Sequence, residues 1–138
     1  MIIDITQLQQ LDKFSLSFAQ SLRPGDVIYL KGDLGAGKTK FTQLLLNNLL
    51  YKGKVKSPTY AIYEQYNLDK LNIIHMDLYR IGDPQELYYL AIDEIFDGNN
   101  VVLIEWPEKG TGVIPSASKT LGFELTNADN RELILDTT

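Results

Sequence analysis

Residues 32–39 read Gly-Asp-Leu-Gly-Ala-Gly-Lys-Thr, which is the phosphate-binding pattern G-x-x-x-x-G-K-[ST], the P-loop. The pattern lies between an apolar run at 27–30 and a helical pattern that starts near Lys38. In this context the glycines let the backbone curl so that its N–H groups point inward, and the positive end of the following helix adds to them. The stretch therefore predicts an α/β protein that binds the phosphates of a nucleotide.

Each residue of this loop has an expected task. Lys38 would reach the β- and γ-phosphates, and the hydroxyl of Thr39 would bind Mg²⁺. The remaining nucleotide-binding groups are expected in the backbone of Asp33, Leu34, Gly35, Ala36 and Gly37. A nucleoside triphosphate and Mg²⁺ are thus the ligands that the motif indicates.

Composition limits the alternatives. With 138 residues and 44% hydrophobic content, the chain fits one compact P-loop domain over residues 1–138. It has no cysteine and one histidine, so any metal would be held by oxygen. We find no signal-peptide pattern and no apolar run near the ~18 residues of a membrane span, and we expect a cytoplasmic protein with no membrane partner.

The net charge argues against a broad nucleic-acid footprint. It is −5, whereas proteins that bind nucleic acid usually carry a basic face. Lys52, Lys54 and Lys56 form a local exception. We interpret these lysines as a solvated loop beside a strand.

Hydrophobic periodicity predicts the order of the elements. Apolar residues at spacings of three and four predict a helix over 8–22, and the P-loop helix is expected over 38–50 with Gly53 as a left-handed cap just beyond it. Predicted strands are 27–30, a hairpin of 61–68 and 71–79, a buried strand at 101–104, and a second hairpin of 120–126 and 132–137. Asp83 and Pro84 are typical of a helix start, with a short helix through Leu90, and 92–96 is ambiguous. The pattern predicts a P-loop NTPase-like three-layer sandwich with a mixed, mainly parallel central sheet and antiparallel hairpins.

Two carboxylates are expected at the phosphate site. Ligands of open α/β sheets bind beyond the carboxyl ends of the strands, where Asp77 ends one predicted strand and Glu105 follows another. Glu105 is in the place of a Mg²⁺ ligand, and Asp77 is a candidate for orienting the attacking water or reaching the metal through water. The plainer interpretation of either residue is a carboxylate that caps a turn.

Two neighbours of these carboxylates have open roles. His75 precedes Asp77 by two residues, so both side chains should share a face of the sheet, and His75 could orient Asp77. A hydrogen-bonded core histidine is the alternative. Trp106 could pack on the nucleotide, on a partner or in the core.

The supply of arginine bears on the reaction. The chain has Arg23, Arg80 and Arg131, and only Arg80 is predicted near the site. A kinase needs several cations to hold donor and acceptor phosphates, so slow hydrolysis, or hydrolysis completed by a partner, is favoured. No N-K-x-D segment for reading guanine occurs, which favours adenine.

Four motifs taken in order resemble a known family. The P-loop is followed by Ser57-Pro58-Thr59-Tyr60, by His75-Met76-Asp77-Leu78-Tyr79-Arg80, and by Ile104-Glu105-Trp106-Pro107. Together they resemble the bacterial TsaE (YjeE) ATPases of tRNA threonylcarbamoyladenosine biosynthesis. The likeness runs over most of the chain.

The resemblance implies roles for individual residues. Thr39 and Glu105 would hold Mg²⁺, Lys38 the phosphates, and Asp77 would be essential for turnover. Thr59 would belong to a switch-like segment near the γ-phosphate, and Arg131 is similar to a family arginine near the nucleotide. Thr6 or Gln7 would lie near the base. Lys40 departs from the family, which often has a second threonine there.

The resemblance also implies partners. A TsaB–TsaD-like complex would carry out the transfer to tRNA, and this chain would contact tRNA only through that complex. The leading hypothesis is therefore a Mg²⁺-dependent ATPase subunit that is weak alone. A nucleotide-dependent binding module without significant hydrolysis and a small-molecule kinase are the alternatives.

Overall fold

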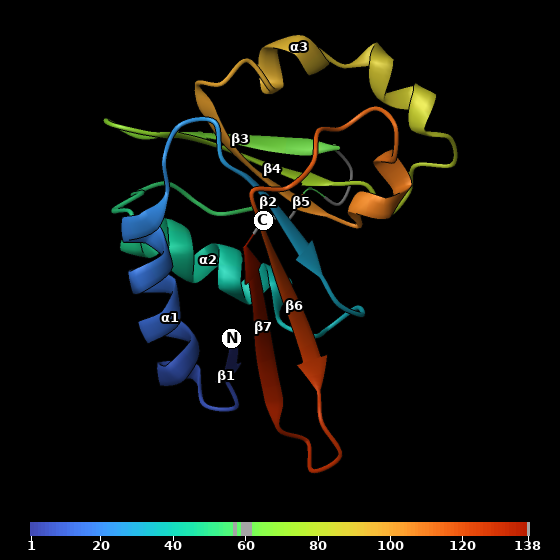
Figure 1. Cartoon of the computed structure of the whole chain (residues 1–138). Coiled ribbons are helices and arrows are strands. Elements are labelled where there is room, and N and C mark those ends of the chain that lie inside the picture. Colours follow the sequence, from blue (N-terminus) through green and yellow to red (C-terminus); the bar gives the residue numbers. More distant parts are fainter. Residues whose placement is uncertain (57, 59–61, 138) are drawn as a thin grey trace.

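A single mixed sheet forms the centre of the molecule (Figure 1). The computed structural model describes residues 1–56, 58 and 62–137. In these residues the sheet has seven strands in the order β1-β7-β6-β2-β5-β4-β3. The strands are β1 (Ile2–Asp4), β2 (Val27–Lys31), β3 (Tyr63–Asn67), β4 (Asn72–Asp77), β5 (Asn100–Glu105), β6 (Lys119–Leu125) and β7 (Arg131–Thr137). The helical segments are α1 (Leu8–Ser21), α2 (Lys38–Asn48), the 3₁₀ helix η1 (Pro84–Tyr89), α3 (Ile92–Ile95) and the 3₁₀ helix η2 (Pro107–Gly110).

Parallel pairing occupies the middle of the sheet. β2 pairs in parallel with β5 on one side and β6 on the other, and β4 continues in parallel beside β5. The hairpins β3–β4 and β6–β7 are antiparallel, as predicted, and so is the pair of β1 with β7. The predicted mixed sheet is confirmed, with its parallel part limited to the four central strands.

Helices cover both faces of the sheet, which gives the three predicted layers. Figure 1 shows α1 and α2 together on one side and α3 on the other. On the α1/α2 side, Phe18 and Phe41 pack edge to face with ring centres 5.8 Å apart, and Phe123 of β6 lies 5.7 Å from Phe41. On the other side, Leu87 of η1 and Ile95 of α3 are buried against the sheet. Buried apolar side chains on both faces hold the central strands in place.

The structure corrects several details at the ends of elements. The residue in the left-handed conformation after α2 is Leu50, with φ of 64°, and Gly53 does not adopt a positive φ. The prediction of Gly53 as the left-handed cap was wrong, because α2 ends at Asn48 and the chain turns earlier than expected. The short helix after Asp83 is a 3₁₀ helix, and the ambiguous segment 92–96 contains α3.

Two short elements were not predicted. β1 has only three residues, and its place in the sheet comes from pairing with β7, since Ile3 lies opposite Leu133. η2 follows Trp106 directly and begins with Pro107. Among the described residues, no helix has the length and apolar character needed to cross a membrane.

Candidate functional site

A pocket of about 610 Å³ opens where the central strands end and the P-loop begins. The loop leaves β2 in the middle of the sheet, and Asp77 and Glu105 end the neighbouring strands β4 and β5 opposite one another. The predicted meeting of the P-loop with these two strand ends is therefore present in the structure. The pocket is lined by Leu34, Gly35, Gly37, Lys38, Thr39, Lys40, Pro58, Ile62, Asp77, Tyr79, Arg80, Ile81, Glu86, Glu105, Trp106 and Arg131.

Glycine is required at two points of the loop. Gly37 is the N-cap of α2 with φ of 115°, a conformation that L side chains rarely adopt. Gly32 has φ of 146°, and a Cβ there would lie 2.6 Å from the backbone oxygen of Phe123 on β6. The close approach to β6 and the positive φ values fix the course of the loop, which directs the start of α2 into the pocket.

Lys38 is held inside the pocket. Its side chain is only 4% exposed, and Nζ donates a hydrogen bond of 2.5 Å to the backbone oxygen of Gly32. The same nitrogen lies 3.9 Å from Oε1 of Glu105 and 4.4 Å from the centre of the Trp106 ring. The ammonium group is thus surrounded by a carbonyl, a carboxylate and an aromatic face, all of which stabilise its positive charge.

Glu105 is paired with His75. Nε2 of His75 lies 2.6 Å from Oε2 of Glu105, and both residues are buried. The sequence left two interpretations of His75 open, and the structure shows the hydrogen-bonded buried histidine, because the ring contacts the carboxylate of Glu105 on the neighbouring strand β5. Among the described residues, the other ring nitrogen, Nδ1, has no hydrogen-bond partner although it is buried.

Asp77 lies at the pocket wall in a half-buried position. Its Oδ1 accepts a hydrogen bond of 3.0 Å from the backbone N–H of Tyr79. Burial raises the pKa of Asp77 above its usual range, and the negative charge of Glu105 adds to this, while the Tyr79 N–H, His75 and Lys38 act in the opposite direction. A carboxyl group with a raised pKa beside a phosphate-binding loop is suited to accept a proton from a bound water.

Trp106 begins a stack of aromatic and cationic groups at the pocket mouth. Its backbone is left-handed, with φ of 56°, and its ring centre lies 5.1 Å from that of Tyr79. Lys109 of η2 in turn lies 5.4 Å from the centre of the Tyr79 ring. In the described structure Trp106 therefore contacts Lys38 and Tyr79 and lines the pocket, and its packing on a nucleotide stays a prediction.

Arg131 reaches the P-loop from the start of β7 and lines the pocket, so the prediction that Arg80 alone of the three arginines lies near the site is wrong. A Cβ built on Gly37 would lie 3.7 Å from Nη1 of Arg131, so the guanidinium group covers the last glycine of the loop. The backbone of Arg131 is held by Thr6, whose Oγ1 accepts a hydrogen bond of 3.0 Å from its N–H. Thr6 thus lies in a small cavity beside the loop, whereas Gln7 caps α1.

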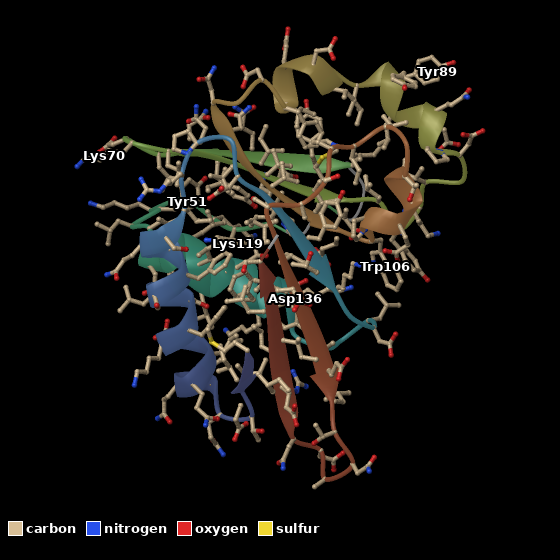
Figure 2. The ribbon with its side chains drawn as sticks, in the orientation of Figure 1. Tyr51, Lys70, Tyr89, Trp106, Lys119 and Asp136 are labelled. Atoms are coloured by element: carbon tan, nitrogen blue, oxygen red, sulfur yellow. The ribbon has the colours of Figure 1, made fainter. Side chains whose placement is uncertain are left out.

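The other predicted residues divide into three groups. Thr39, Leu34 and Gly35 line the main pocket, as does Arg80, while Asp33 and Ala36 line an adjoining groove against β6. Thr59 lies outside the described residues, as do Ser57 and Tyr60 of the same motif. Lys52 lies on a separate groove with Tyr51 and Lys70, and Figure 2 shows those two side chains at the opposite end of the molecule from Trp106.

Sequence reasoning did not select Ile81 and Glu86, which also line the pocket. Both follow the His75–Arg80 motif, and the 3₁₀ helix η1 places Glu86 there. Its Oε2 accepts a hydrogen bond of 3.3 Å from the N–H of Gly82, which folds this segment back toward the pocket. The sequence carried no pattern that would distinguish these two residues from other loop residues.

The oxygen groups at the pocket fit Mg²⁺. The hydroxyl of Thr39 and the carboxylate of Glu105 are hard donors, and Oε1 of Glu105 is the oxygen that His75 leaves free. Mg²⁺ is commonly bound by one or two such groups together with the phosphates of a substrate. Among residues 1–56, 58 and 62–137, no group of three or more His, Cys, Asp or Glu side chains is arranged to hold a metal ion.

This fold and this site define a P-loop protein, in which a glycine-rich loop between a central parallel strand and a helix faces two strand-end carboxylates. The family model described as "Threonylcarbamoyl adenosine biosynthesis protein TsaE" matches residues 5–133. The chain belongs to the TsaE family.

Individual relatives agree with this assignment. A Haemophilus influenzae protein named "tRNA threonylcarbamoyladenosine biosynthesis protein TsaE" is 45% identical over 112 residues, which are 80% of this chain and 71% of that protein. A Bacillus subtilis protein of the same name is 37% identical over 127 residues, 92% of this chain and 77% of that protein. The crystal structure of Bacillus subtilis YdiB matches with a TM-score of 0.80 and 28% identity, covering 99% of this chain and 84% of the other.

Proposed function

We propose that this protein is a Mg²⁺-dependent ATP hydrolase that is weak alone and supports formation of the threonylcarbamoyl modification on the adenosine beside the anticodon of tRNA. It would act in the cytoplasm with a TsaB–TsaD-like complex, through which its contact with tRNA would be indirect. The observation that carries the proposal is the meeting of Lys38 with Glu105 and Asp77 in one pocket at the start of α2. Membership of the TsaE family supplies the pathway.

Each side chain has a task in this proposal. Lys38 and the loop amides would bind the β- and γ-phosphates and stabilise the charge that develops on them. Asp77 would orient the attacking water and accept its proton, a task that its raised pKa favours. Arg131 would cover the nucleotide from the side of Gly37.

Thr39 and Glu105 are the residues that would hold Mg²⁺, which when bound neutralises charge on the phosphate oxygens. The rest of the site would position the substrate and limit its contact with water. The described cationic side chains that line the pocket are Lys38, Lys40, Arg80 and Arg131. We expect a slow basal rate that a partner increases.

Phosphate release from ATP tests the proposal. The protein is assayed alone and then with a TsaB–TsaD pair and tRNA, with Glu105→Ala and, as a matched control, Glu108→Ala. Glu108 is exposed on η2 three residues further along the chain. We expect the rate to rise with the partners, to fall by about 100-fold or more in Glu105→Ala, and to stay within about twofold in Glu108→Ala.

Other outcomes would redirect the assignment. Binding of ATP with no phosphate release in any mixture would make the chain a nucleotide-dependent binding module. Transfer of phosphate to an acceptor instead of water would make it a kinase. An equal rate with and without the partners would contradict the dependence on a complex.

A further inference from the structure

His75 is a buried ionisable residue to which the proposed reaction assigns no task. We propose that it is a positioning residue for Glu105, whose Oε2 it holds through Nε2–H so that Oε1 faces the phosphate side of the pocket. The inference rests on the proposed function in one respect, since it takes Glu105 as a Mg²⁺ ligand.

The sheet brings the two side chains together. In the parallel pair of β4 and β5, Asp77 lies opposite Glu105 and His75 lies opposite Leu103. Because alternate residues of a strand share a face, His75 and Glu105 project from the same face one diagonal step apart. The 2.6 Å contact of Nε2 with Oε2 spans this diagonal.

The proposed role of Glu105 gives this hydrogen bond a direction. A carboxylate that holds Mg²⁺ is ionised and only accepts, so Nε2 of His75 would carry the proton and donate it. His75 is 1% exposed and Glu105 is 4% exposed, and the bond is therefore shielded from water.

The unpartnered nitrogen points to the same role. Buried polar atoms in proteins are nearly always hydrogen-bonded, and a histidine that served only the core would be expected to satisfy both nitrogens. Among the described residues, Nδ1 of His75 has no partner. Within the part of the chain that the structure describes, the hydrogen bond that this ring makes is thus the one to Glu105.

The hydrogen bond from His75 occupies Oε2 of Glu105 and leaves Oε1 available to a ligand in the pocket. Oε1 of Glu105 lies 3.9 Å from Nζ of Lys38, which is an ion-pair distance and too long for a hydrogen bond. With Oε2 held on the strand side, the glutamate cannot rotate freely, and Oε1 is presented in the pocket. Donors that hold a metal-binding carboxylate in this way typically contribute 10- to 100-fold to metal affinity or activity.

The test compares nucleotide affinity with and without Mg²⁺. Calorimetry measures binding of a non-hydrolysable ATP analogue in excess Mg²⁺ and again in EDTA, and the ratio of the two affinities is the Mg²⁺ gain. The variants are His75→Leu, which removes the donor, and His75→Gln, whose amide N–H has a reach similar to that of Nε2. Met76→Leu is the matched control, because Met76 is the next residue of β4, is fully buried and faces the opposite layer.

We expect His75→Leu to lower the Mg²⁺ gain by about 10- to 100-fold while the affinity in EDTA stays within about threefold. His75→Gln should restore most of the gain, and Met76→Leu should leave it unchanged. An unchanged gain in a folded His75→Leu protein would overturn the inference. If that variant does not fold, His75→Asn replaces it, since its shorter amide does not reach Oε2; equal gains in His75→Asn and His75→Gln would overturn the inference as well.

The same measurements separate this inference from the proposed function. A wild-type protein without any Mg²⁺ gain would contradict both. A gain that is lost in Glu105→Ala and kept in all His75 variants would contradict the positioning role alone. A gain that depends on His75, in a protein that never releases phosphate, would support the positioning role and contradict hydrolysis.

The protonation of the His75 ring can also be measured directly, because the chain contains one histidine. Long-range ¹H–¹⁵N NMR of the imidazole reports which nitrogen carries the proton, without assignment of competing signals. We expect Nε2 to be protonated in the wild-type protein. A ring protonated only on Nδ1 would overturn the inference.

Discussion

Asp77 is the pocket carboxylate whose pKa is raised by burial. Burial raises its pKa from the ordinary value of 3.8, so ionisation is harder in the folded chain than in the unfolded chain. An acid with a raised folded pKa lowers stability as the pH rises from its unfolded pKa through its folded pKa. Above that window the full cost of the buried charge is present.

The replacement Asp77→Asn should therefore remove activity without lowering stability at neutral pH. The asparagine Oδ1 retains the acceptor for the Tyr79 N–H, and the buried charge is lost. We expect the free energy of unfolding of the variant, relative to wild type, to increase as the pH rises from about 4 to 7. Urea unfolding at several pH values measures this, with the exposed Asp93→Asn as control. A relative stability that falls over this range would contradict the assigned direction.

Gly32 gives a second prediction for a single residue. A Cβ there would meet the backbone oxygen of Phe123 at 2.6 Å, and a backbone oxygen in a paired strand has little freedom to move. We expect Gly32→Ala to lower the free energy of unfolding by about 1–3 kcal/mol more than a glycine replacement without a clash. Gly98→Ala is that control, because Gly98 has φ of 91° and nothing within 4 Å of its Cβ position. Equal losses in urea unfolding would show that φ alone explains the glycine.

At the level of the element, η1 connects the buried apolar layer on the α3 side of the sheet to the pocket. Leu87 of η1 is fully buried, whereas Tyr89, two residues further on, is 93% exposed and projects from the surface in Figure 2. The same short helix presents Glu86 to the pocket. Its attachment to the sheet thus supports one wall of the site.

This arrangement predicts very different costs for two replacements in η1. Leu87→Ala should lower the free energy of unfolding by about 2–5 kcal/mol, because it opens a cavity among Ile81, Ile95 and their neighbours. Tyr89→Ala should change it by less than about 0.5 kcal/mol. Denaturant unfolding of the two variants checks the contrast, and a similar loss in both would contradict the burial of η1.

The sequence predicted most elements because their signals are local. The continuous apolar run at 101–104 and the two hairpins identified β5 and the strand pairs correctly, since alternation and turn residues act over a few positions. β1 was missed because three residues carry no usable period, and its strand conformation depends on β7. Leu50, a poor candidate for a positive φ, was missed for the same reason: the surrounding structure imposes it.

The residues of the site also divide into those that a local pattern predicts and those that depend on the pairing of distant strands. The P-loop pattern located Lys38 and Thr39, and the rule on strand ends located Asp77 and Glu105. The partner of His75 could not be predicted, because the pairing of β4 with β5 determines it and no local pattern encodes that register.

At the level of the whole molecule, the proposed ligand should stabilise the fold. A ligand that binds only the folded state adds about 2.7 kcal/mol to stability at a concentration 100 times its Kd. We expect ATP with Mg²⁺ to raise the melting temperature and Lys38→Ala to abolish this increase, although the variant itself also loses a buried ion pair. Thermal unfolding with and without ligand measures both effects. A ligand-induced shift that persists in Lys38→Ala would contradict phosphate binding at the loop.

The order of strands in the sheet also bears on how the chain is made. β2, which carries the P-loop, is synthesised early, yet its two neighbours in the sheet are β5 and β6, which are encoded far downstream. Arg131, which covers Gly37, comes later still. While the chain emerges from the ribosome, the hydrophobic P-loop strand therefore has no neighbour to pair with. We expect the nascent protein to be unable to bind nucleotide until β7 has left the exit tunnel.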